Sequence, residues 1–205
     1  MTTLYYSPAA CSLSPHIALR EAGLPFTLER VDLAAKTLNG GADFNRVNGK
    51  SYVPVLQFDD GDILTEGVVI VQHIADQQPG SSLAPKAGTR ERACLQEWLN
   101  FLATEVHKGF GPFFNAQSGE DWKRFAANKL ANRFDWISTQ LGDKSYLMGE
   151  QFTVADGYLF TLLNWTTFDF VPLNLDNWPM LAEYYERVKA RPKVQEALQA
   201  EGLLS

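Results

Sequence analysis

The sequence predicts an α/β unit followed by an all-α unit, because two kinds of pattern divide the chain near residue 80. Short segments rich in β-branched and aromatic residues precede this point, at residues 3–6, 26–33, 53–58 and 63–64. After it, apolar residues recur every three or four positions, which is the spacing of amphipathic helices. Between the two regions lies a stretch rich in proline, glycine and serine. We therefore place the domains at residues 1–81 and 88–205.

The elements of the first domain are predicted to follow the order βαβ and then ββα. A helix over residues 15–22 connects the first two strands and ends at Gly23, a residue common just after a helix C-terminus. The sequence Asp-Asp-Gly-Asp at residues 59–62 is typical of a hairpin turn between the last two strands. Residues 66–78 include a β-branched run, yet their apolar spacing favours a buried helix.

Helices account for all the patterns of the second domain. Two amphipathic patterns run over residues 95–110 and 122–141, and the sequence 154–165 is apolar nearly all round, which predicts a central helix. This central helix follows Thr153-Val154-Ala155-Asp156, a close relative of the capping box. A further helix is expected to begin at Pro179 and to end near Arg191.

Composition excludes several functional classes. The 205 residues are 45% apolar and carry a net charge of -6 with neither half basic, so the chain lacks the basic surface of a nucleic-acid-binding protein. No apolar run approaches the roughly 20 residues that span a bilayer. Two cysteines are too few for a disulfide framework, and three scattered histidines lack metal-ligand spacing. We expect a soluble cytoplasmic protein without a bound metal.

Cys11 is the first residue with a chemical interpretation. It follows the first strand and precedes the first helix, where unpaired N–H groups and the helix dipole favour a thiolate. Cys11 and Ser14 resemble the Cys-x-x-Cys redox motif with its second thiol replaced, so a mixed disulfide formed here has no internal thiol to resolve it. The alternative is that Cys11 is a small buried hydrophobic residue.

Two further sequences of the first domain each allow a functional and a structural interpretation. Val53-Pro54 opens a strand, and a cis bond there would turn the Val53 backbone outward to pair with a peptide-like ligand, whereas base rates favour trans. Glu66 and Gly67 stand at a predicted helix start, where free N–H groups bind carboxylates and a glutamate can accept an ammonium group. The alternative for Glu66 is a helix cap with a first-turn acid.

Three polar residues share one stripe of the predicted helix over 95–110. Asn100, Thr104 and His107 lie at positions i, i+4 and i+7, opposite the apolar face. A solvated face explains the stripe without any ligand. His107 nevertheless titrates in the ordinary pH range and is a candidate hydrogen-bond donor.

Taken in order along the chain, these motifs resemble those of the bacterial beta-class glutathione transferases, which use a cysteine. The resemblance extends from Leu4 to Leu203. The sequences that carry it are Cys11-Ser12-Leu13-Ser14-Pro15-His16, Val53-Pro54-Val55-Leu56, Leu64-Thr65-Glu66-Gly67, Glu97-Trp98-Leu99-Asn100-Phe101, Glu105-Val106-His107-Lys108-Gly109 and Phe152-Thr153-Val154-Ala155-Asp156. It implies a thioredoxin-like domain, an all-helical domain, and a homodimer with glutathione bound in a cleft between the domains.

The resemblance also implies a role for each residue of the site. Val53 would bond the glutathione cysteinyl unit through its backbone, next to a cis Pro54. Glu66 and Gly67 would hold the γ-glutamyl end, and Lys36 the glycyl carboxylate. Cys11 would face the glutathione sulfur as a catalytic residue. Asn100, Thr104 and a catalytic His107 would complete the site from the helical domain, either of the same chain or of the partner subunit.

The expected activity is conjugation of the glutathione thiol to a small hydrophobic electrophile, with glutathione as co-substrate and no other cofactor. One alternative is glutathione-dependent thiol–disulfide exchange with Cys11 as nucleophile. Another is a non-catalytic protein that binds glutathione or another ligand on the same fold, since a fold alone does not determine function. The chain departs from the family at Asn48-Gly49-Lys50-Ser51-Tyr52, where relatives commonly have Asn-Pro-Lys-Gly.

Overall fold

Contacts in the computed structural model, which describes residues 1–204, divide the chain into two units. The first unit comprises Met1–Ala84 and the chain from Ala190 onward, and the second comprises Pro85–Lys189. The predicted domains, 1–81 and 88–205, follow the order of the chain instead. The two descriptions differ at the last helix, whose contacts are with the first unit.

The first unit is built on a five-stranded sheet in the order β3-β2-β1-β4-β5. Strands β1 and β2 are parallel, and the other neighbouring pairs are antiparallel. The elements are β1 Thr2–Tyr6, α1 Leu13–Ala22, β2 Phe26–Asp32, β3 Thr37–Leu38, β4 Val55–Gln57, β5 Ile63–Thr65, α2 Gly67–Gln77 and α8 Pro192–Ala200. The βαβ and ββα order is confirmed, whereas the two-residue strand β3 was not predicted.

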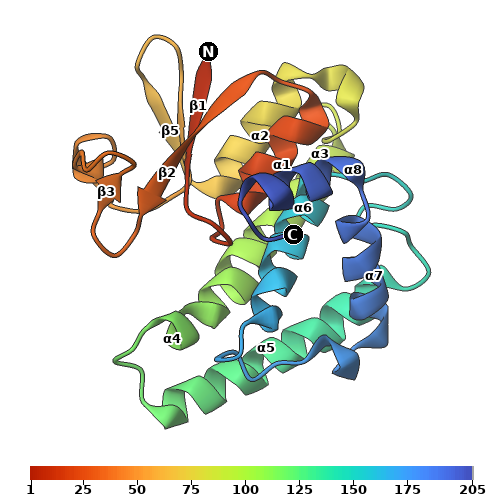
Figure 1. The fold of residues 1–205 in the computed structure, drawn as a ribbon. Helices are drawn as coiled ribbons and strands as arrows, with labels where there is room; N and C mark the ends of the chain where they lie inside the picture. The colour runs from red at the N-terminus through yellow and green to blue at the C-terminus, as the bar shows by residue number, and fades with distance from the viewer. Residues whose placement is uncertain (205) are drawn as a thin grey trace. The chain divides into compact units, whose positions relative to one another are not determined.

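Side chains alternate between the two faces of this sheet because successive residues of a strand point to opposite sides. Tyr5, Val31 and Val55 form a buried core with Phe44 and Val53. On the other side lie α1 and α2, which contact each other, and α8 lies against α1 (Figure 1). Helices α1 and α2 therefore lie on one side of the sheet, and α8 packs on α1.

The predicted helix boundaries of the first unit are largely confirmed. Helix α1 ends at Gly23, which has φ +67° and donates its N–H to backbone carbonyls of the last turn. Residues 67–77 form helix α2, in which Ile70 and Ile74 are buried. The helical interpretation of this β-branched segment was therefore correct.

The second unit contains only helices and turns among its described residues. Its main elements are α3 Arg90–Phe101, a π-helix Leu102–His107, a 3-10 turn Lys108–Phe110, α4 Gly111–Phe114, α5 Glu120–Leu141, α6 Val154–Asn164 and α7 Pro179–Lys189. The prediction of one continuous α-helix over residues 95–110 is wrong. Ten of the eleven residues of α6 are buried, as expected of a central helix.

Asp156 connects α6 to two other parts of the second unit. Its side chain is fully buried, and one oxygen accepts hydrogen bonds from the N–H and the hydroxyl of Thr153, at 2.8 and 2.9 Å. The other oxygen accepts from the Leu147 N–H at 2.8 Å and from the Tyr184 hydroxyl at 2.9 Å. The predicted capping box is confirmed, and its acid also holds the loop before α6 and helix α7.

The structure describes no helix that is long and apolar enough to cross a membrane within residues 1–204.

Replacing Asp156 with alanine should lower the free energy of unfolding by about 3 kcal/mol, because four buried donors lose their acceptor. Chemical denaturation followed by tryptophan fluorescence measures the change. Asp121→Ala is the matched control, since Asp121 is also a first-turn acid but its side chain is 94% exposed. Equal effects of the two substitutions would contradict the role assigned to the buried acceptor.

Candidate functional site

Residues 48–54, hereafter the 48–54 segment, connect the 3-10 turn Phe44–Arg46 to strand β4. The buried side chain of Asn48 organises this segment from within. Its Oδ1 accepts the Lys50 N–H at 3.0 Å, and its Nδ2 donates to the Tyr52 carbonyl at 2.8 Å. A turn bond from the Ser51 N–H to the Asn48 carbonyl closes the same loop at 2.9 Å. These hydrogen bonds hold the 48–54 segment together although it has no regular secondary structure.

Cys11 contacts Val53, near the end of the 48–54 segment. It is half-buried and lies two residues before Leu13, where α1 begins. Its thiol donates a hydrogen bond to the Val53 carbonyl at 3.3 Å, and the Val53-Pro54 peptide bond is cis. The interpretation of Cys11 as a wholly buried packing residue is therefore wrong, and so is the trans bond favoured by base rates.

Glu66 contacts the 48–54 segment through its carboxylate. Oε1 accepts hydrogen bonds from the Tyr52 hydroxyl at 2.6 Å and from Lys50 Nζ at 2.8 Å. These bonds raise the pKa of the Lys50 ammonium and that of the Tyr52 phenol, because both donors are stabilised in their protonated forms. Glu66 occupies the N-cap position of α2, as the alternative interpretation expected, but its side chain makes no cap bond and contacts Lys50 and Tyr52 instead.

Glu66 and Gly67 join β5 to α2 through an unusual backbone conformation. Glu66 has φ +69°, in a region that disfavours residues with a Cβ, while its carbonyl accepts the N–H groups of Val69 and Ile70 at 2.9 Å. Gly67 is the first residue of α2, and a Cβ added there would lie 3.7 Å from the Pro54 ring. The helix N-terminus thus lies against the 48–54 segment.

Lys36 contacts the 48–54 segment from the loop between β2 and β3. Its Nζ donates to the Ser51 carbonyl at 2.9 Å, and its own φ is +58°. All five site residues predicted in the first unit therefore lie at the 48–54 segment, three through hydrogen bonds and two beside Pro54. The hydrogen bonds of Lys50 and Tyr52 to Glu66 were not predicted. The sequence marked these two positions only as a departure from the family.

His107 is the one candidate residue of the second unit whose side chain is partly buried. Its Nδ1 lies 2.6 Å from the Tyr158 hydroxyl, and its ring meets the Trp165 ring edge-on at 5.0 Å between centroids. Burial, aided by the charge of Lys108, lowers the pKa of His107 to about 4. The ring is therefore neutral at physiological pH and acts through hydrogen bonds rather than as a cation.

Asn100 and Thr104 have a different environment from His107. Both are exposed, and the Thr104 hydroxyl donates to the Asn100 carbonyl at 3.0 Å. Within residues 1–204, no hydrogen bond joins either of them to His107. The three residues were assigned to one α-helical stripe, but the π-helix from Leu102 to His107 changes the angular spacing between them. Asn100 and Thr104 are exposed, as the alternative of a solvated face predicts, whereas His107 does not fit that alternative.

No cluster that could hold a metal ion occurs among the described histidines, cysteines and acidic residues of residues 1–204.

Comparison with known proteins identifies the family of both regions. Residues 9–77 match the model of the glutathione S-transferase N-terminal domain, and residues 104–201 match that of the C-terminal domain. The chain is 44% identical over 200 residues to the glutathione S-transferase GstA of Escherichia coli O157:H7, covering 98% of both chains.

Solved structures agree with the sequence comparison. The beta-class glutathione S-transferase of Sphingomonas chungbukensis is 43% identical, with a TM-score of 0.94 over 98% of this chain and 100% of that one. A sphingomonad glutathione S-transferase complexed with glutathione is 40% identical, with a TM-score of 0.93 and the same coverage. The fold predicted from the sequence is confirmed.

The His107 ring should titrate near pH 4 rather than near 6.5, because burial disfavours the imidazolium. Two-dimensional NMR of the imidazole resonances, assigned with a His107→Gln variant, measures the titration. The depressed pKa also means that the unfolded chain binds more protons between pH 6.5 and 4, so the free energy of unfolding falls as the pH is lowered through this window. A His107 midpoint between pH 6 and 7 would contradict the buried, neutral ring.

Proposed function

Because the chain belongs to the glutathione S-transferase family and is a glutathione transferase, we propose that the residues around the 48–54 segment bind glutathione and orient its thiol. The observation that supports this proposal is the convergence of Cys11, Lys36 and Glu66 on one short segment. They offer a thiol, an ammonium and a carboxylate to a tripeptide that carries a thiol, carboxylates and an ammonium.

Each group of glutathione has a complementary partner. The Lys36 ammonium suits the glycyl carboxylate, and the Glu66 carboxylate suits the ammonium of the γ-glutamyl end. The first turn of α2, which begins at Gly67, offers N–H groups to the γ-glutamyl carboxylate. The Val53 backbone suits the cysteinyl unit, as in the addition of a short extended strand.

Binding requires an exchange of partners at Val53. The Val53 carbonyl accepts a hydrogen bond from the Cys11 thiol, an interaction that only the protonated thiol makes. The amide N–H of the glutathione cysteinyl unit is a stronger donor than a thiol and takes over this carbonyl. Cys11 then donates its hydrogen bond to the glutathione sulfur, which stabilises the thiolate form of glutathione.

The stabilised thiolate attacks a carbon of the electrophile. Its electron pair forms the C–S bond, and a leaving group departs with the electron pair of the bond that breaks. We propose that the electrophile is small and hydrophobic and that conjugation serves detoxification. We further propose that Asn100, Thr104 and His107 complete the glutathione site. A neutral His107 ring would contribute hydrogen bonds there.

Thiol–disulfide exchange is the second candidate, favoured by the half-buried free thiol of Cys11. In this reaction the Cys11 thiolate attacks a disulfide, forms a mixed disulfide and expels a thiolate. A glutathione thiolate then attacks the mixed disulfide and regenerates Cys11. Ser14 cannot replace that second step because it has no thiol.

The chain is proposed to act as a cytoplasmic homodimer. The family resemblance supports the dimer, and two free cysteines in the described chain suit a reducing compartment.

Substitution of Glu66 by glutamine should raise the KM for glutathione about tenfold to a hundredfold, because a charge-assisted bond to the ligand ammonium is lost. Conjugation of glutathione to a chlorinated dinitrobenzene measures this, and the KM for the aryl chloride should not change. Asp59→Asn is the control, since Asp59 is an exposed acid of the same unit. An unchanged glutathione KM in Glu66→Gln would exclude Glu66 from the site.

Cys11→Ala separates the two reactions. Conjugation should persist with a loss of about tenfold, since one hydrogen bond to the thiolate disappears, whereas glutathione-dependent reduction of a small disulfide should vanish. Cys94→Ala, which removes the other free thiol, should leave both activities unchanged. If disulfide reduction survived in Cys11→Ala, Cys11 would not be its nucleophile.

A further inference from the structure

The residues just before Cys11 form a turn with an unfavourable conformation. The Ala10 N–H donates to the Ser7 carbonyl at 3.1 Å and closes a four-residue turn in which Pro8 is second and Ala9 third. Ala9 has φ +59°, as the third position of a type II turn requires. Glycine or asparagine normally occupies that position, because the Cβ of alanine crowds the backbone there. Something outside the turn must therefore keep Ala9 in place.

Two side chains hold the turn from outside. The buried Ser12 hydroxyl accepts the Ser7 N–H at 3.1 Å and donates to the Ser7 carbonyl at 3.2 Å, which fixes the first residue. The Ala9 N–H, at the strained residue, donates to Glu201 Oε2 at 3.0 Å. Glu201 is 192 positions away in the sequence and follows directly after helix α8.

The carboxylate of Glu201 is itself held in one orientation. Glu201 Oε1 lies 2.8 Å from His16 Nδ1, and both side chains are fully buried. Arg20 Nε donates to His16 Nε2 at 2.9 Å, so Nε2 carries the lone pair and Nδ1 carries the proton. His16 therefore donates to Glu201, and a chain of hydrogen bonds leads from Arg20 through His16 and Glu201 to Ala9.

Helix α8 brings Glu201 to this position by ion pairs with α1. Arg191, the residue before α8, makes two bonds to the Glu21 carboxylate at 2.7 and 2.8 Å. Arg20 also lies 3.4 Å from Glu196. The C-terminal helix is thus tied to α1 independently of the Glu201 contact, which provides a control for the experiment below.

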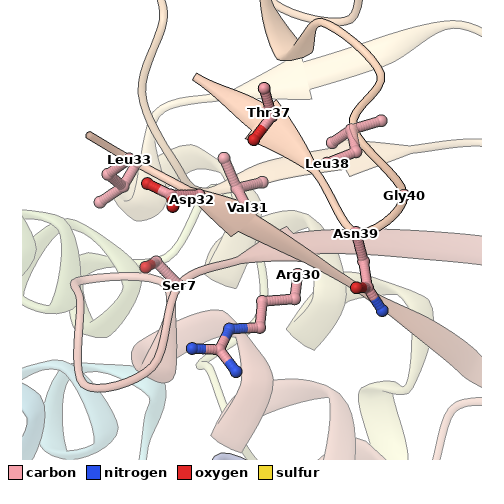
Figure 2. A pocket seen from close by; sticks show the side chains of 9 residues that line it. All are labelled: Ser7, Arg30, Val31, Asp32, Leu33, Thr37, Leu38, Asn39 and Gly40. Atoms are coloured by element: carbon pink, nitrogen blue, oxygen red, sulfur yellow. The ribbon is translucent and has the colours of Figure 1, made fainter. Parts of the chain in front are cut away.

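The turn has little other support on the side of Ser7. The Ser7 side chain faces an open pocket of about 470 Å³, which is also lined by Arg30, Asp32 and Asn39 (Figure 2). Apolar packing of the turn comes instead from its last residue, Ala10, which lies against the buried cluster around Val31 and Val53. The hydrogen bond to Glu201 acts directly on Ala9, the residue with the positive φ.

We propose that Glu201 is a positioning residue for Cys11. By holding Ala9 at positive φ, its carboxylate places Cys11, two residues later, where the thiol meets the Val53 carbonyl. Its importance for conjugation rests on the proposed function, whereas its effect on the Cys11 thiol can be measured in the protein without substrate.

The test is a cycle of substitutions at residues 9 and 201 in a Cys94→Ser background, so that Cys11 is the only thiol. In Glu201→Ala, alkylation of Cys11 by iodoacetamide should become about tenfold faster and kcat/KM for conjugation about tenfold lower, since the thiol leaves the Val53 carbonyl. Adding Ala9→Gly should restore both rates to within about threefold, because glycine adopts positive φ without strain.

Two further variants separate positioning from stability. Arg191→Gln loosens α8 without touching Glu201 and should lower the melting temperature with Cys11 alkylation unchanged. Glu201→Gln keeps an oxygen acceptor for Ala9 and serves if Glu201→Ala does not fold. Glu201→Gln should show a smaller rise in the rate of Cys11 alkylation and a smaller fall in kcat/KM, and adding Ala9→Gly should again reverse both.

Positioning is disproved if Arg191→Gln alters Cys11 alkylation as much as the Glu201 variants do, or if Ala9→Gly restores nothing. The two readouts also separate this proposal from the proposed function. If Cys11 alkylation changes across the variants as expected but the protein without substitutions at residues 9 and 201 shows no conjugation, the proposed function is refuted and the positioning role stands.

Discussion

Three successive carbonyl groups, those of Ser51, Tyr52 and Val53, determine how the candidate site is built. No strand ladder pairs them, and each has its own side-chain donor: Lys36, Asn48 and Cys11 respectively. Backbone polar groups in a buried or half-buried loop need such partners. These side chains hold the backbone of the loop in place, and two of them, Lys36 and Cys11, are also groups that the proposed function assigns to glutathione.

The same arrangement gives the candidate binding groups partners within the protein. Lys36 and Cys11 bond to protein carbonyls, and the Glu66 carboxylate bonds to Lys50 and Tyr52. Protein partners thus occupy groups that the proposed function assigns to glutathione. Binding then replaces existing hydrogen bonds rather than ordering a flexible loop, which reduces the entropic cost of association. The cost that remains is the loss of those internal bonds.

Local patterns in the sequence predicted most of the fold. Helix α2 was found by its apolar spacing in spite of its β-branched residues, and Thr153 and Asp156 predicted the start of α6. Strand β3 was missed because two residues carry no periodicity. The π-helix was missed because the apolar residues of an α-helix and those of a π-helix coincide over a single turn.

The candidate site was predictable in part, and for a different reason. A pattern of residue types marked Cys11, Lys36, Val53, Glu66 and Gly67 through their resemblance to a family, and the structure brings them to one segment. The partners of Glu66 could not be found in this way, since Lys50 and Tyr52 lie 16 and 14 positions away and meet it only through the fold. The roles of Asn100, Thr104 and His107 in binding stay predictions.

The last helix shows why the order of elements along the chain is not the order of packing. Helix α8, Pro192–Ala200, was not predicted, and apolar spacing could not have said which neighbours it has. The deciding features are charged side chains: Arg191 has a partner in Glu21, and Glu201 has one in His16. A carboxylate as deeply buried as that of Glu201 is stable only where donors are already in place. Helix α1 and the turn before it supply those donors, so the C-terminal residues complete the first unit although the whole second unit separates them from it in sequence.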